Sequence, residues 1–338
     1  MTIRFPQAHA FDCIGPNKQQ QMLSDRFLTP NIENIMAGIA KIRARIDEHF
    51  ETLKAKAHSE PQADHLAGLI DIKMYPYGFC ERIRDMVWNS LHTSLKNPNA
   101  GQGHFTELRT FIHEGGLFRK IWGELTHGPY FQNAIQVGSY YLDASNDTVV
   151  TTKPKLEILP LAQTNFQNID SFEQYFDVAS TYYQWETYPN SFLPNLAPLY
   201  PGVAIHKQSK AMLICDVPLP LMFKNMESRG QMAMRFLKHS SYSQKSMPSQ
   251  YLDLLTKHQN TIWRKRNQNV LTAHPTEFEL IPLNDSKQKI ADALRRLETW
   301  IAENHHLAEY EKALVKLDRN RKIFDRSLRR YTTSRPSP

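Results

Sequence analysis

The chain has 338 residues, of which 41% are hydrophobic and 11% aromatic, and this composition excludes wholesale disorder. Its three cysteines, Cys13, Cys80 and Cys215, are too few and too scattered for a disulfide framework or a Cys-type zinc site. The formal net charge is +7 and is uneven: residues 221–338 hold 22 Lys and Arg against 12 Asp and Glu, and residues 1–220 hold 19 against 22. Such a basic segment either faces an anionic partner or forms a solvated helical surface.

No apolar run approaches the ~20 residues that are needed to cross a bilayer. Residues 1–22 also lack an apolar stretch long enough for a secretory signal. We therefore expect no integral membrane segment and a cytoplasmic protein, with export that needs no cleavable signal as the alternative.

Helical spacing of apolar residues dominates the N-terminal part. Residues 31–57 predict a long helix, because one stripe collects Ile32, Ile35, Met36, Ile39, Ile42, Ile46, Phe50 and Leu53. Shorter helices are expected over residues 64–70 and 105–112, and helical spacing recurs over residues 117–125.

Strand-like patterns begin at residue 131. Residues 131–161 are rich in β-branched and aromatic residues, and Gly138-Ser139 between two such runs predicts a hairpin. Further strands are expected over residues 182–189, 202–207 and 211–217.

Helical patterns return after Pro220, over residues 226–239, 248–269 and 286–331. The chain therefore predicts an α+β fold in three regions: a helical N-terminal region (1–72), an α+β core with a central antiparallel sheet (73–220) and a basic helical C-terminal region (221–338).

Cys80 lies where a helix is expected to begin. Turn chemistry in residues 75–78 precedes it, and helical spacing of Ile83, Val87 and Leu91 follows. The partial positive charge at a helix N-terminus lowers a thiol pKa and favours a nucleophile. The alternative is an inert cysteine packed as a small hydrophobic residue.

The order of Cys80, a helix and two strands, with Asp143 on the second strand in "YYLDASND", resembles the papain-like and transglutaminase-like core. The segment "GFCERI" is also similar to the region around the catalytic cysteine of arylamine N-acetyltransferases, which share this core. The resemblance covers residues 73–150. It implies that Cys80 attacks an acyl carbon, that Asp143 orients a histidine base, and that backbone amides at the helix start stabilise the oxyanion.

Asn133 stands ten residues before Asp143, where such families place the histidine. An asparagine amide does not titrate near neutral pH and cannot act as a general base. His127 is the first candidate for a replacement base, and His113 and His104 are the others.

Two hypotheses about function follow. The first is a thiol-dependent acyltransferase or amide hydrolase, active or degenerate, that acts on an acyl or amide substrate, such as a protein, without a cofactor or metal. The alternative is a non-catalytic interaction protein that binds an acidic partner through its basic C-terminal helices, with weak, non-specific attraction to polyanions.

Other patterns are weaker. The E-x-x-H pairs Glu124/His127 and Glu303/His306 would suit a di-iron bundle if they were helical, but strand-like sequence separates them. Asp143 and Asp147 suggest a glycosyltransferase metal site, but they form no Asp-x-Asp motif and follow no Rossmann-like alternation. Turn hydrogen bonding is their more ordinary use.

Overall fold

The computed structural model describes residues 11–59, 72–97, 103–126, 130–190, 197–210, 212–214 and 217–258, together with residues 288, 291, 292 and 295. The chain divides into two compact units. The first unit is Ala10–Asn168, and the second contains Met1–His9 and Ile169–Pro338. The three regions predicted from composition remain a prediction.

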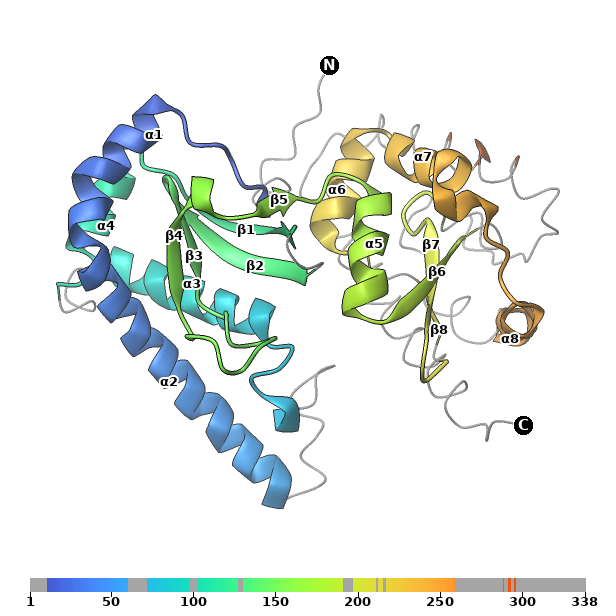
Figure 1. Cartoon of the computed structure of the whole chain (residues 1–338), viewed down its shortest axis with the longest axis horizontal. Helices are drawn as coiled ribbons and strands as arrows, with labels where there is room; N and C mark the ends of the chain where they lie inside the picture. The colour runs from blue at the N-terminus through green and yellow to red at the C-terminus, as the bar shows by residue number, and fades with distance from the viewer. Residues whose placement is uncertain are drawn as a thin grey trace. The chain divides into compact units, whose positions relative to one another are not determined.

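Helices make up the N-terminal part of the first unit, as predicted (Figure 1). Short helical segments lead into the long helix α2, and α3 begins at Cys80. The segments are α1 (Lys18–Leu23), η2 (Ser24–Leu28), η3 (Thr29–Asn31), α2 (Ile32–Ser59), η5 (Ile72–Met74), α3 (Cys80–Lys96) and α4 (Thr106–His113).

A five-stranded antiparallel sheet completes this unit, in the order β4-β3-β2-β1-β5. Its strands are β1 (Phe118–Leu125), β2 (Tyr130–Val137), β3 (Tyr140–Asp143), β4 (Glu157–Pro160) and β5 (Phe166–Asn168), with the short helix η6 (Leu161–Gln163) before β5. The predicted hairpin is confirmed, since β2 and β3 pair antiparallel on either side of Gly138, whose φ of 59° suits a tight turn.

The helical pattern of residues 117–125 was misleading, because this segment forms β1. All eight residues of β1 pair with β2. Gly123 on β1 allows β5 to approach, since a Cβ there would lie 2.1 Å from the carbonyl oxygen of Gln167. Pairing with two neighbouring strands outweighs the local spacing of apolar residues.

The two faces of the sheet bury different sets of residues. On β2 and β3, Ile135, Val137 and Leu142 belong to one core with the apolar stripes of α2 and α3. Ala134 and Tyr141 alternate with them and pack with Ile121 in a smaller cluster. The helices therefore cover one face of this sheet, and the smaller cluster lies on the other.

The second unit contains a three-stranded sheet, in the order β6-β7-β8, and several helices. Its elements are α5 (Phe172–Tyr182), β6 (Trp185–Pro189), β7 (Gly202–His206), β8 (Met212–Ile214), α6 (Leu219–Glu227), α7 (Gln231–His239), η7 (Ser241–Gln244) and α8 (Ser249–His258). The rings of Phe172, Phe176, Phe236 and Tyr242 form its aromatic core. The strands were predicted, and α5 was not.

The predicted helices at 64–70 and 286–331 lie outside the described residues, apart from the isolated positions near 290. In the part of the chain that is described, no helix is both long and apolar enough to cross a membrane.

Candidate functional site

Cys80 is the first residue of α3, as the sequence predicted. The turn before it is fixed from two sides. The Gly78 amide donates a hydrogen bond to the carbonyl of Thr148 (3.1 Å), and Phe79 is fully buried against the rings of Phe50 and Tyr75. The Cys80 side chain is half-buried and faces β2.

Asn133 of β2 contacts the Cys80 thiol. Its Nδ2 donates a hydrogen bond to Cys80 Sγ at 3.3 Å, and its Oδ1 accepts one from Arg84 Nη1 at 2.7 Å. Arg84 lies one turn after Cys80 on α3, is 1% exposed and forms an ion pair with Asp85 at 2.9 Å. Because a guanidinium only donates, Arg84 holds the amide oxygen toward itself and the amide nitrogen toward the sulfur.

Burial raises the pKa of the Cys80 thiol above its usual range. The Asn133 amide and the backbone amide of Glu81 act in the opposite direction, but burial is the larger effect. The lowered pKa expected at a helix start is therefore overcome by desolvation. A thiol of this kind is protonated at neutral pH and reacts slowly as a nucleophile.

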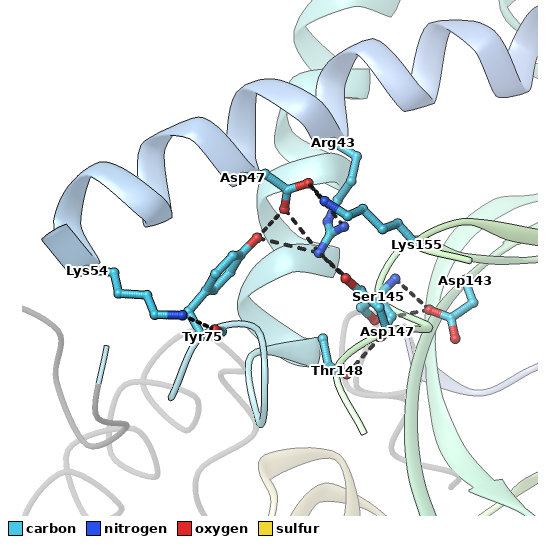
Figure 2. Close-up of polar contacts among 9 residues, drawn as sticks. All are labelled: Arg43, Asp47, Lys54, Tyr75, Asp143, Ser145, Asp147, Thr148 and Lys155. Carbon is cyan, nitrogen blue, oxygen red and sulfur yellow. Dashed lines mark hydrogen bonds and ion pairs between the residues drawn. The ribbon is translucent and has the colours of Figure 1, made fainter. Parts of the chain in front are cut away.

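Asp143 lies on the opposite face of the sheet from Cys80. The register pairs Ile135 with Leu142, so strand alternation places Asp143 on the face opposite Leu142 and Asn133. Asp143 is therefore not placed to orient a base beside Cys80, the role that the resemblance implies for it. Its carboxylate instead accepts hydrogen bonds from the Ser145 amide (2.7 Å), the Ser145 hydroxyl (3.0 Å) and Gln132, and Figure 2 shows the contacts with Ser145.

Burial raises the pKa of Asp143 to about 6, although its hydrogen bonds from Ser145 and Gln132 lower it in part. The carboxyl is 2% exposed. The ionised carboxylate is therefore less stable in the folded protein than in the unfolded chain, where its pKa is about 4.

Replacing Asp143 with Asn is expected to raise the free energy of unfolding at pH 8 by about 3 kcal/mol. The folded protein binds this proton more tightly than the unfolded chain. The carboxyl's favourable contribution is therefore complete below pH 4 and is lost as pH rises through about 6. Denaturant unfolding of both proteins at pH 4 and pH 8 measures the difference, which should shrink to near zero at pH 4. A difference that does not change with pH would contradict this.

The histidine candidates do not lie beside Cys80 in the described residues. His104 contacts the Asn34 side chain (2.7 Å) and Lys41 Nζ (2.9 Å) of α2, and the His113 side chain is 87% exposed. His127 lies outside the described residues, as does the pair Glu303/His306. Glu124 lies on β1, so the helical geometry assumed for its E-x-x-H pair is wrong.

The described residues include no group of side chains arranged to bind a metal ion. Among the residues that the structure places, no cluster of three or more His, Cys, Asp or Glu side chains could hold an ion. The glycosyltransferase-like use of Asp143 and Asp147 also lacks support, because both carboxylates are engaged in hydrogen bonds within the protein.

A buried ionic network, which the sequence did not indicate, joins α2 to the segments around this site (Figure 2). Arg43 is 1% exposed, and its Nη2 contacts both carboxylate oxygens of Asp147, at 3.1 and 3.2 Å, and Asp47 at 3.2 Å. The Tyr75 hydroxyl donates to Asp47, and Lys155 Nζ lies 2.6 Å from the same carboxylate.

This network fixes the two loops that frame the start of α3. Tyr75 belongs to the turn before Cys80, and Asp147 belongs to the loop after β3. Lys54 of α2 adds a hydrogen bond to the Tyr75 carbonyl at 2.9 Å. Hydrogen bonds and ion pairs thus join the segments around Cys80, although the residues that contact the thiol are not those of a catalytic triad.

Comparisons of the chain with protein-family models, with curated proteins and with solved structures found no match.

Proposed function

We propose that the protein functions by binding an acidic partner through its basic C-terminal third and that the unit around Cys80 is a non-catalytic scaffold. The observation that carries the scaffold part of this conclusion is the Asn133 amide, which lies 3.3 Å from the Cys80 sulfur. A catalytic cysteine needs a base that can accept its proton. A carboxamide does not accept a proton near neutral pH, so Asn133 cannot be this base.

Three further features support a scaffold. Arg84 fixes the orientation of the Asn133 amide, so that this group cannot turn its oxygen toward the thiol. Burial keeps the Cys80 thiol protonated, since its pKa is raised. Asp143, which the resemblance would assign to orienting a base, bonds with Gln132 and Ser145 on the other face of the sheet.

The binding part of the proposal rests on the distribution of charge. Residues 221–338 carry ten more basic than acidic side chains, whereas the rest of the chain is slightly acidic. Arg326, Arg329 and Arg330 stand close together near the end of this segment. Positive charge concentrated in one part of a chain attracts an acidic surface and speeds its association.

We expect a fluorescent poly-glutamate peptide to bind the full chain at low salt and to dissociate as salt increases, because salt screens the attraction between opposite charges. Replacing Arg326, Arg329 and Arg330 with Gln should weaken binding by about tenfold, as expected for a loss of roughly 1.4 kcal/mol. Replacing the exposed Lys56, Lys96 and Lys153 with Gln gives the matched control, with the same change in net charge. Fluorescence anisotropy measures all three.

Cys80→Ala should leave this affinity unchanged. A DNA duplex in the same assay should bind only weakly and be released near about 150 mM salt. An equal loss of affinity in the two triple variants would contradict the proposal, because it would show that the basic third binds the acidic peptide no better than the rest of the surface. Selective, salt-resistant DNA binding would identify the basic third as a nucleic-acid site instead.

A further inference from the structure

Two loops of the first unit, residues 72–79 and 148–155, leave large apolar side chains in water. We call these segments the paired loops, because the Gly78 amide of one donates a hydrogen bond to the Thr148 carbonyl of the other (3.1 Å). The exposed apolar side chains are Met74 (53% exposed), Tyr77 (53%) and Val150 (41%). The hydrogen bond between the loops brings them to one end of this unit.

The paired loops carry positive charge and no negative charge. Their sequences contain Lys73, Lys153 and Lys155 but neither Asp nor Glu. Lys155 balances Asp47, at 2.6 Å, whereas the Lys153 side chain is exposed beside Val150 in the sequence. Exposed apolar and basic side chains together suit a partner surface that is both apolar and anionic.

The buried ionic network holds the paired loops from beneath (Figure 2). The Tyr75 hydroxyl donates to Asp47, and Lys54 Nζ donates to the Tyr75 carbonyl at 2.9 Å. Asp147, directly before the second loop, bonds to Arg43. The outward apolar side chains do not help this unit to fold, because only area removed from water stabilises it. Contacts that already order the loops lower the entropy cost of binding.

The chemistry of the paired loops favours a lipid membrane as the partner. A tyrosine ring suits the boundary between headgroups and acyl chains, where its hydroxyl reaches water. Acyl chains accept Met and Val side chains without a complementary shape, whereas a protein partner needs a pocket for each of them. Lysines beside the apolar side chains attract anionic headgroups.

We propose that the paired loops bind the surface of an anionic lipid membrane. Met74, Tyr77 and Val150 enter the boundary between headgroups and acyl chains. Lys73 and Lys153 lie against the headgroups. Binding of this kind is peripheral and needs no membrane-spanning segment. This surface is separate from the basic third and goes beyond the function proposed above.

The test measures cosedimentation of the full chain with vesicles of phosphatidylcholine, with or without about 30% phosphatidylserine. Replacing Met74, Tyr77 and Val150 together with Ser should weaken binding to the anionic vesicles by at least about tenfold, because the apolar surface that enters the membrane is lost. The matched control replaces exposed residues of the same kinds elsewhere with Ser, namely Met22, Tyr183 and Ile14. This control should bind as wild type does.

Charge is tested by Lys73→Gln combined with Lys153→Gln. This variant should bind the anionic vesicles at least about tenfold more weakly and should bind the neutral vesicles as wild type does, because only anionic headgroups attract the lysines. The basic third also attracts anionic vesicles, so every variant is measured again in a second background. That background replaces three basic residues with Gln: Arg326, Arg329 and Arg330. The losses caused by the loop substitutions should persist there.

Hydrogen exchange of the wild-type chain makes the test independent of how well the variants fold. Anionic vesicles should slow exchange in peptides from residues 73–79 and 148–155, and neutral vesicles should slow it less. Equal binding by the two triple Ser variants, or unchanged exchange in the paired loops, would overturn the proposal. Protection of these loops by the poly-glutamate peptide but not by vesicles would also overturn it, and would identify an acidic protein surface as their partner.

Discussion

Arg43→Met is expected to destabilise the first unit by about 3–5 kcal/mol, the range measured when one partner of a buried ion pair is removed. The substitution keeps most of the volume of the side chain but leaves the Asp147 carboxylate, 4% exposed, without the Arg43 Nη2 that contacts both of its oxygens. Asp47, 15% exposed, loses a contact at 3.2 Å at the same time. Uncompensated buried charge, and not a cavity, is the reason for the loss.

Hydrogen exchange in peptides from α2 and α3, measured at increasing urea concentration, gives the stability of this unit separately from that of the second. Lys155→Met is the matched control, because Lys155 contacts the same network at Asp47 but its side chain is 57% exposed. We expect a loss of at most about 1 kcal/mol for this exposed pair. Arg43→Met combined with Asp147→Asn should cost less than Arg43→Met alone. If Arg43→Met behaves like the control, the network does not stabilise the frame of the site.

Much of the first unit could be predicted, because its signals are local. The apolar stripe of α2, the turn before Cys80 and the Gly138 hairpin are all readable from neighbouring residues. The helix α5 was also readable: Ser171 caps it by accepting a hydrogen bond from the Gln174 amide, and Phe172, Tyr175 and Phe176 have helical spacing.

The strand β1 was not readable, because its apolar residues imitate a helix. Phe118, Ile121, Trp122 and Leu125 follow the i, i+3, i+4, i+7 pattern of one helical face. Only pairing with β2 and β5, which are contributed by later segments, makes this segment a strand.

The prediction of the candidate site depended on the register of the strands, which a sequence does not give to a single residue. Counting ten residues back from Asp143 led to Asn133, whose amide contacts Cys80 in the structure. The same count could not show that Asp143 faces the other way, since a shift of one residue exchanges the two faces of a strand. The contact between Arg43 and Asp147 joins residues 104 positions apart, a separation at which sequence periodicity carries no information.

The measurement that tests the scaffold interpretation most directly is the rate at which iodoacetamide alkylates Cys80 as a function of pH. Mass spectrometry of peptides distinguishes Cys80 from Cys13 and Cys215, and the denatured chain supplies the rate of a free thiol, whose pKa is about 8.5. We expect native Cys80 to react more slowly than denatured Cys80 at every pH, with a midpoint above the free value, because burial disfavours the thiolate.

An activated thiol with a pKa near 6 would instead be mostly thiolate at pH 7 and hold about thirty times more thiolate than the free group. Asn133→Ala should slow the native reaction further, since the amide is a hydrogen-bond donor to the sulfur. Slow alkylation with a midpoint above the free value is the result that a non-catalytic Cys80 predicts. Fast alkylation at pH 6, lost on denaturation, would contradict it and show that a base reaches the thiol.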